Sequence, residues 1–168
     1  MKAKKIALFG ILGALAITVS FIDGLFALPF LPPGAKIGLS NVITLFALNV
    51  LNLWGGIYVV TVKAVFALLT RGVSAFLLSF SGGLLSFLVM AVLLKMKKCP
   101  FSIIGISIIG AIIHNIAQLG VSMFLTGTSA LIYYLPVLVV FSLFSGTVTG
   151  VIIKILKPYI QRIREQDL

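Results

Sequence analysis

The sequence predicts an all-α, polytopic membrane protein: a single domain over residues 1–168, built as a bundle of six transmembrane helices. Of the 168 residues, 61% are hydrophobic and 10% are charged, which is more apolar surface than a soluble domain of this size can bury. Apolar runs follow one another along the chain, and a hydrocarbon core of about 30 Å takes about 20 helical residues to cross. The cations gather between these runs, as they do beside a bilayer.

The apolar runs define the expected helices. We expect spans at residues 6–28, 37–53, 55–70, 75–94, 101–124 and 132–156, followed by a cytoplasmic tail at 157–168. The first run follows a basic N-terminus, as a signal peptide does, but it is longer than a usual signal segment and has a poor cleavage site, so we expect it to be retained. Trp54 with Gly55 and Gly56 predicts a tight turn between the second and third spans. The stretch Val73–Gly83 fits either a continuous helix or a break at its serines and glycines.

Basic residues give the expected orientation. They precede the first span, follow the fourth and end the sixth: Lys2, Lys4, Lys5, Lys95, Lys97, Lys98, Lys154, Lys157, Arg162 and Arg164. Six spans place all of them on one side, which the positive-inside rule makes cytoplasmic. We therefore expect a multi-pass protein of the cell membrane with both termini in the cytoplasm. The net charge of +10 then reflects the bilayer and not a nucleic-acid partner, because the cations form no soluble basic face.

A proline-broken stretch, Leu28–Asn41, separates the first two spans. Its three prolines, Pro29, Pro32 and Pro33, cannot sit inside a regular helix. Irregular backbone near a membrane is tolerated where protein buries it or water reaches it, so the stretch fits a lid over a ligand site. A plain loop at the membrane surface is the alternative. The charge distribution places the stretch on the outer face, where Lys36 is the sole cation of its loop.

Lys63 lies well inside the third span, where a cation is costly and suggests function. It either pairs with Asp23, the one carboxylate expected in the membrane, or faces a polar cavity and meets an anionic ligand. Lys36 and Arg71 add two cations toward the outer side, which favours an anionic or electron-rich solute. For each of these two, the alternative is a side chain that extends to the lipid headgroups.

Polar residues mark the fifth span. His114 and Gln118 are four residues apart and share a helix face, with Asn115 beside them. They either bind a ligand or join helices by hydrogen bonds. Ser81 in the fourth span either binds the polar end of a ligand at a helix break or belongs to a set of small residues that lets helices pack closely. A lone histidine is a poor metal site, and Cys99 is the only cysteine, so we expect no metal and no other cofactor.

The first span carries a face of small residues: Ala7, Gly10, Gly13 and Ala14. Small residues let another helix approach closely. The face serves either packing within the bundle or docking to a partner subunit.

Catalytic signatures are missing from the sequence. It has no Walker A motif, no aspartate-rich motif for a Mg²⁺-diphosphate, and too few acids for a Ser/His/acid set. We therefore expect that the chain is not an enzyme, and that any ATPase or prenyltransferase activity belongs to partner subunits.

Three segments together resemble a known family: PGAKIGLSN at 33–41, SGGLLS at 81–86 and HNIAQ at 114–118. They are similar to the small membrane family labelled Gx transporter or heptaprenyl diphosphate synthase component I. In size, span count and small-residue first helix, this family resembles the S components of energy-coupling factor (ECF) transporters. The residues at motif positions are Lys36, Asn41, Ser81, His114, Asn115 and Gln118. Lys63 and Arg71 join the expected substrate site from charge placement alone.

The resemblance implies a non-catalytic subunit that captures a small solute at the outer face. The solute would be like a vitamin or quinone precursor, and anionic or aromatic. The expected partners are a transmembrane coupling subunit, which the small-residue face would dock, and two cytoplasmic ATPases. The alternative is a membrane subunit or scaffold of heptaprenyl diphosphate synthase or the isoprenoid-quinone pathway. The scarcity of aspartates favours the transporter.

Overall fold

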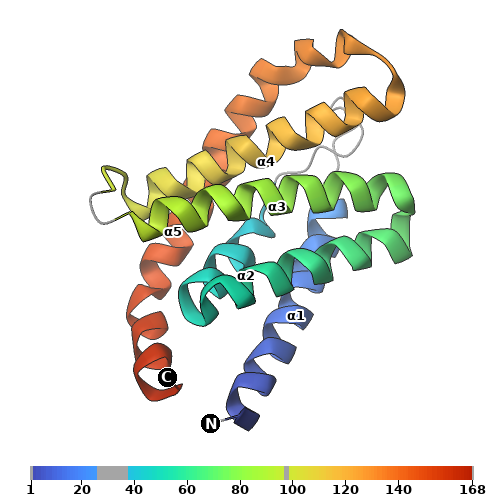
Figure 1. Cartoon of the computed structure of the whole chain (residues 1–168). Coiled ribbons are helices and arrows are strands. Elements are labelled where there is room, and N and C mark those ends of the chain that lie inside the picture. The colour runs from blue at the N-terminus through green and yellow to red at the C-terminus, as the bar shows by residue number, and fades with distance from the viewer. Residues whose placement is uncertain (1, 26–37, 97–98, 168) are drawn as a thin grey trace.

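The computed structural model describes residues 2–25, 38–96 and 99–167, which form an all-α bundle (Figure 1). Its elements are α1 Lys2–Leu25, α2 Asn41–Arg71, α3 Val73–Lys95, α4 Ile103–Thr126, the 3-10 helix η1 Ser129–Tyr134, and α5 Leu135–Asp167. Within the described residues, five helical segments are long and apolar enough to cross a membrane. The architecture is therefore that of a multi-pass membrane protein.

The number of long helices differs from the prediction: the described residues form five, not six. The expected spans 37–53 and 55–70 correspond to the two helical limbs of α2, which meet at a kink at Asn52 (φ 58°, ψ −152°). The axis of α2 changes direction sharply there (Figure 1). The turn expected at Trp54–Gly56 is wrong, because these residues are helical. Gly56 is small for a packing reason, since a Cβ on it would overlap the ring of Phe87 in α3.

Two further boundaries depend on packing. α3 is continuous from Val73 to Lys95, so its serines and glycines do not break it. α5 continues to Asp167 through Pro158, so most of the expected tail at 157–168 is helical. The extension is stabilised because Ile160 is buried in the core, where Ile163 also packs. Residues 26–37, which hold Lys36 and most of the proline-broken stretch, lie outside the described residues.

Glycines allow close approach between α3, α4 and α5. A Cβ on Gly110 of α4 would lie 2.6 Å from the Sδ of Met90 in α3. A Cβ on Gly146 of α5 would lie 2.5 Å from the Cα of Ile108 in α4. Larger residues would force these helices apart, so the glycines fix the spacing on which the buried polar groups depend.

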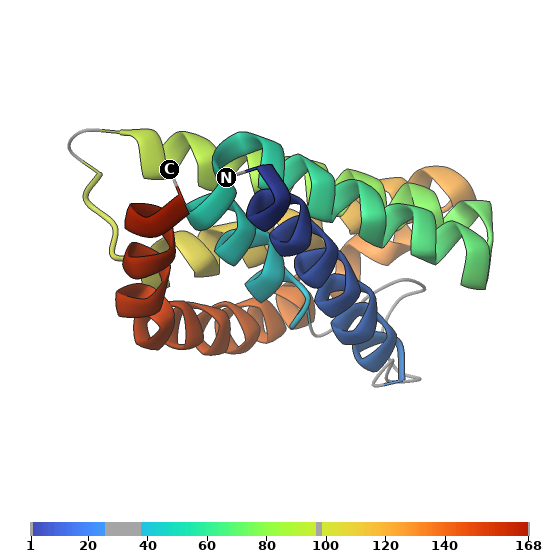
Figure 2. The same ribbon diagram turned by 90° about the horizontal axis from the view of Figure 1, so that it is seen from below.

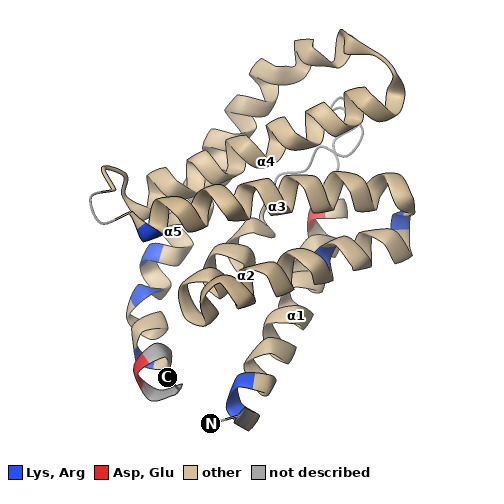
Figure 3. Ribbon diagram, viewed as in Figure 1, with Lys and Arg blue, Asp and Glu red and all other residues tan. Residues whose placement is uncertain are grey.

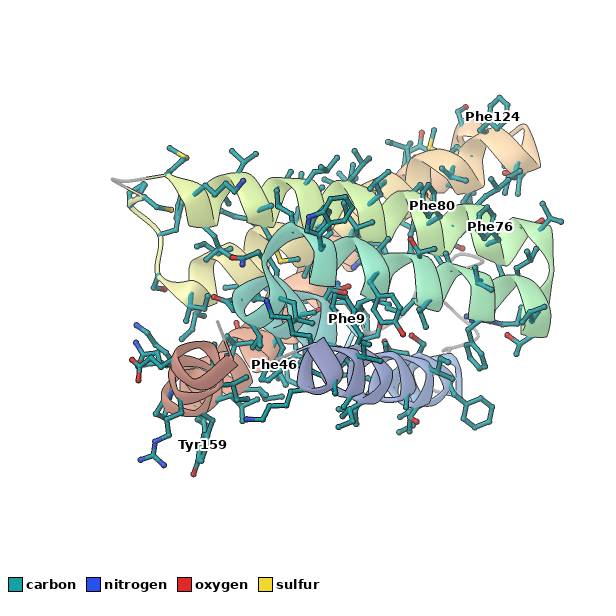
Figure 4. All side chains as sticks on the ribbon, turned by 60° about the horizontal axis from the view of Figure 1, so that its bottom comes forward. Phe9, Phe46, Phe76, Phe80, Phe124 and Tyr159 are labelled. Carbon is teal, nitrogen blue, oxygen red and sulfur yellow. The ribbon has the colours of Figure 1, made fainter. Side chains whose placement is uncertain are left out.

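Aromatic residues both pack the bundle and cover its outside (Figure 4). Phe9 of α1 meets Tyr58 of α2 edge to face, with ring centroids 5.0 Å apart. Phe76 and Phe80 of α3 are stacked, with centroids 5.7 Å apart. Phe124, near the end of α4, is 85% exposed, as a side chain in contact with lipid would be.

Both chain ends lie at one end of the molecule (Figure 2). The end of α3, which carries Lys95, and the cations of α5 lie toward that same end (Figure 3). Arg71 ends α2 at the turn into α3, which lies at the opposite end of the bundle. The arrangement matches the expected grouping of the cations, and the assignment of that end to the cytoplasm stays a prediction.

Candidate functional site

Asp23 of α1 holds the start of α2. Its side chain is fully buried, at 0% exposed. Oδ1 accepts a hydrogen bond of 3.0 Å from the backbone N–H of Leu39, and Oδ2 accepts one of 2.9 Å from the N–H of Ser40. A carboxylate at a helix N-terminus satisfies donors that the helix leaves open and complements its dipole. The one carboxylate expected in the membrane therefore has a positioning role.

Lys63 approaches the same turn from the second half of α2. Its side chain is 4% exposed, and Nζ lies 3.5 Å from Asn41 Oδ1 and 3.5 Å from Thr44 Oγ1. A buried carboxylate and a buried cation thus both contact the first turns of α2. The two predicted roles of Lys63, an ion pair with Asp23 and contact with an anionic ligand, stay predictions.

A second polar group lies on α4. His114, Asn115 and Gln118 are 5%, 4% and 4% exposed. Asn115 Nδ2 donates a hydrogen bond of 2.8 Å to Ser142 Oγ of α5. Gly82 of α3 packs against the same group, because a Cβ on it would lie 2.8 Å from Gln118 Cγ and 3.0 Å from the carbonyl oxygen of His114. Asn115 therefore joins two helices, while its neighbours face α3.

Residues of α5 connect the two groups. Ser145 Oγ lies 3.8 Å from where a Cβ on Gly38 would be, and that position is also 3.5 Å from Asn41 Nδ2. Ser145 Oγ in turn donates a hydrogen bond of 3.5 Å to the carbonyl oxygen of Ser142. We call the connected set the polar band. Its members, all buried, are Asp23, Ser40, Asn41, Thr44, Lys63, His114, Asn115, Gln118, Ser142 and Ser145.

The polar band contains five of the eight residues predicted for the substrate site: Asn41, Lys63, His114, Asn115 and Gln118. Ser81 is only half-buried, and its hydroxyl donates to Leu78 O within its own helix at 3.3 Å. Arg71 is exposed and borders a separate cavity of about 240 Å³ that Ser20 and Thr70 also line. Lys36 lies outside the described residues.

Four members of the polar band were not selected from the sequence: Ser40, Thr44, and the two serines of α5, Ser142 and Ser145. The signal for the two serines is present, since Leu138, Ser142, Ser145 and Thr149 follow a helical spacing and share one face. All four are buried. Single serines in an apolar helix gave no reason to select them, because their hydroxyls commonly bond to their own backbone.

The four residues of the small-residue face of α1 differ in their exposure. Ala7, Gly10 and Ala14 are exposed, whereas Gly13 is buried. A Cβ on Gly13 would meet the hydroxyl of Tyr58, but a Cβ on Gly10 would meet nothing within 4 Å. Gly13 therefore serves packing within the chain, and the other three remain open to a partner or to lipid.

The chemistry of the polar band suits binding. It combines an ammonium group, amides, hydroxyls and an imidazole inside apolar helices, which can hold a small polar molecule by directed hydrogen bonds. In the part of the chain that the structure describes, no three His, Cys, Asp or Glu residues lie close enough together to hold a metal ion.

Comparison with known proteins adds two findings. The family model for heptaprenyl diphosphate synthase component I matches residues 12–156. The fold is similar to a solved structure described as the S component of a bacterial ECF transporter, with a TM-score of 0.73 and 23% sequence identity, over 96% of this chain and 98% of that one. Among curated proteins, none matches the sequence.

Proposed function

This chain belongs to the heptaprenyl diphosphate synthase component I family, and we propose that it is the substrate-binding membrane subunit of an ECF-type importer. The observation that carries the proposal is the polar band, a set of ten buried polar residues within an S component-like bundle. Polar groups inside a membrane protein are costly and are retained mainly where they serve packing or ligands. Two of the band's buried oxygens, Asn115 Oδ1 and Gln118 Oε1, have no hydrogen-bond partner among the described residues.

The solute is proposed to be small, like a vitamin or quinone precursor, and anionic or aromatic. Lys63 supports the anionic part, because it is a 4% exposed cation whose Nζ lies 3.5 Å from Asn41 Oδ1 and 3.5 Å from Thr44 Oγ1 in the polar band. Asn41, His114, Asn115 and Gln118 complete the contacts. Lys36, Arg71 and Ser81 remain candidates at the outer side, with the proline-broken stretch as a lid.

The proposed partners are a transmembrane coupling subunit and two cytoplasmic ATPases. The open face of α1, formed by Ala7, Gly10 and Ala14, supports the docking of a helix from the coupling subunit. Gly13 is not part of this face, because it packs against Tyr58. In this proposal the chain is not an enzyme, and ATP hydrolysis takes place in the partners.

The test is to express the chain with a coupling subunit and ATPases, purify it, and identify bound small molecules by mass spectrometry. We expect a stoichiometric compound and an uptake of that compound that needs ATP hydrolysis. Absence of a bound compound together with failure to copurify with the coupling subunit would overturn the proposal.

A second candidate is a membrane subunit that brings a prenyl diphosphate synthase to the bilayer. The family description favours it, and so does the basic end of the bundle, where Lys95, Lys154 and Arg162 are exposed. A cavity of about 320 Å³ at that end has Lys157 and Cys99 in its mostly apolar lining. Charge reversal at Lys154 and Arg162 should release a bound synthase in this case, while Lys63→Met should leave it bound.

A further inference from the structure

We infer that the ligand of the polar band presents a hydrogen-bond donor, an N–H or O–H group, to the side-chain oxygens of Asn115 and Gln118. The inference rests on the proposed function and narrows its ligand class. It starts from the buried oxygens themselves: among the described residues, Asn115 Oδ1 and Gln118 Oε1 have no hydrogen-bond partner. Both residues are 4% exposed, so water outside the bundle does not reach them.

Ser142 fixes the orientation of the Asn115 amide. The Oγ of Ser142 lies 2.7 Å from Leu138 O and 3.4 Å from Ala111 O. Carbonyl oxygens only accept, so the single hydroxyl proton of Ser142 goes to one of them. The hydroxyl oxygen must then accept the 2.8 Å hydrogen bond from Asn115. The NH₂ group of Asn115 therefore faces Ser142, and its carbonyl oxygen points elsewhere.

An unpartnered amide oxygen differs from an unpartnered hydroxyl. Ser20 and Ser86 also have buried Oγ atoms without a partner among the described residues, but a hydroxyl can rotate and donate to a carbonyl of its own helix. An amide oxygen has no proton to donate and must be met by an external donor. The two amide oxygens therefore require a donor that the hydroxyls do not.

The residue of α3 that lies against Gln118 is a glycine, Gly82, which has no side chain to donate a hydrogen bond. Gly82 lies against Gln118 and His114, since a Cβ on it would be 2.8 Å from Gln118 Cγ and 3.0 Å from the carbonyl oxygen of His114. Asn115 and Gln118 are three residues apart on α4, so their side chains are neighbours. A single donor-bearing group of a ligand can therefore serve both oxygens.

The polar band also offers a cation, and the two requirements define the ligand class together. Lys63 suits a carboxylate or another anionic group, while Asn115 and Gln118 suit an amine, a ring N–H or a hydroxyl. The ligand is thus a small molecule with an acid at one position and a donor at another. A prenyl diphosphate, which has oxygen acceptors and a hydrocarbon chain, does not meet this requirement.

The test incubates the full-length protein in detergent with a protein-free extract of small molecules from the expressing cells. Retained compounds are identified by mass spectrometry, and their exchangeable hydrogens are counted from the mass increase in D₂O. We expect a compound with at least one N–H or O–H hydrogen beyond those of its acid group. A retained compound without such a hydrogen overturns this inference alone. If the wild-type protein retains nothing, the proposed function fails, and the inference fails with it.

Variants then locate the donor contact with the compound so identified. Gln118→Met removes the acceptor and should weaken binding at least tenfold, whereas Gln118→Glu keeps an acceptor of similar shape and should bind more tightly than Gln118→Met. Asn115→Leu should also weaken binding at least tenfold. The matched control is Ser86→Ala, which removes a buried hydroxyl that can donate to a carbonyl of its own helix. This variant should change binding less than twofold. Equal binding by Gln118→Met and the wild-type protein would contradict the inference.

Discussion

The carboxylate of Asp23 in α1 accepts a hydrogen bond of 2.9 Å from the backbone N–H of Ser40, at the start of α2. This contact crosses 17 positions of the sequence and fixes where α2 begins. Asn41, the next residue, contacts Lys63. The position of Asn41 in the polar band therefore depends on a carboxylate of the preceding helix.

We predict that Asp23→Asn lowers the free energy of unfolding by about 1–3 kcal/mol, because one of two charge-assisted hydrogen bonds to backbone N–H groups is lost. Unfolding in mixed micelles, followed as the SDS fraction rises, measures the change. Glu165→Gln is the control, since Glu165 is exposed. An Asp23→Asn variant as stable as the control would contradict the capping role.

We predict that Lys63→Met separates binding from stability. The free energy of unfolding should stay within about 1 kcal/mol, because removal of the desolvation cost of a buried cation offsets the loss of polar contacts, among them those with Asn41 and Thr44. Affinity for the bound compound should fall about tenfold or more, as expected when a charged hydrogen bond is lost. Equilibrium binding measures this, with the exposed Lys154→Met as control. Unchanged affinity would remove Lys63 from the site.

The glycines of α3 and α4 allow a matched comparison. Gly82→Ala should lower the free energy of unfolding by about 1–3 kcal/mol, because the new Cβ would lie 2.8 Å from Gln118 Cγ. Gly120→Ala in α4 meets nothing within 4 Å and should be neutral or stabilise by up to about 1 kcal/mol through helix propensity. Equal free energies of unfolding for the two variants would contradict close packing of α3 against α4 at Gly82.

Gly10 and Gly13 of α1 should respond differently to substitution by Leu. Gly13→Leu should reduce the stability of the isolated subunit, because its side chain would overlap Tyr58. Gly10→Leu should leave the isolated subunit stable, since the site is open, and should prevent copurification with the coupling subunit. Size-exclusion chromatography of each variant with and without the partner is the measurement. A Gly10→Leu variant that still copurifies would place the docking surface elsewhere.

The effect of substitutions at Asn52 on stability should depend on how well the new residue tolerates the backbone conformation there. Its φ of 58° and ψ of −152° belong to a region that glycine tolerates and other residues resist, at about 1–3 kcal/mol. Asn52→Gly should therefore keep or raise the free energy of unfolding, and Asn52→Val should lower it by about that amount. SDS titration of the two variants compares them directly. The opposite order would show that the side chain of Asn52, and not its backbone, determines the kink.

The sequence was informative where a polar residue interrupts an apolar helix. Lys63, His114, Asn115 and Gln118 stood out because burial of such groups in a membrane is costly, and all four are buried in the structure. Ser142 and Ser145 did not stand out, because a serine can satisfy its hydroxyl locally. Their role depends on the side chains opposite them, which lie on other helices.

The position of the break between the second and third expected spans was wrong for a related reason. Gly55 and Gly56 after Trp54 have the composition of a turn, but their contacts are with Leu51 and Phe87, which no local pattern reveals. The kink lies at Asn52, which a local pattern did not distinguish from Asn49. Pro158 was expected beyond the last span. In the structure α5 includes it, because Ile160 packs into the core and stabilises the helix past the proline. Tertiary contacts decided each of these cases.

Because α2 is kinked at Asn52, the hydrogen bonds of Lys63 connect two differently directed parts of one helix. Asn41 and Thr44 precede the kink and Lys63 follows it, so the ammonium group is a noncovalent crosslink between the two limbs of one helix. A ligand that takes over Nζ replaces that crosslink with itself. Binding of the proposed ligand at Nζ and the angle between the two limbs of α2 are then thermodynamically coupled.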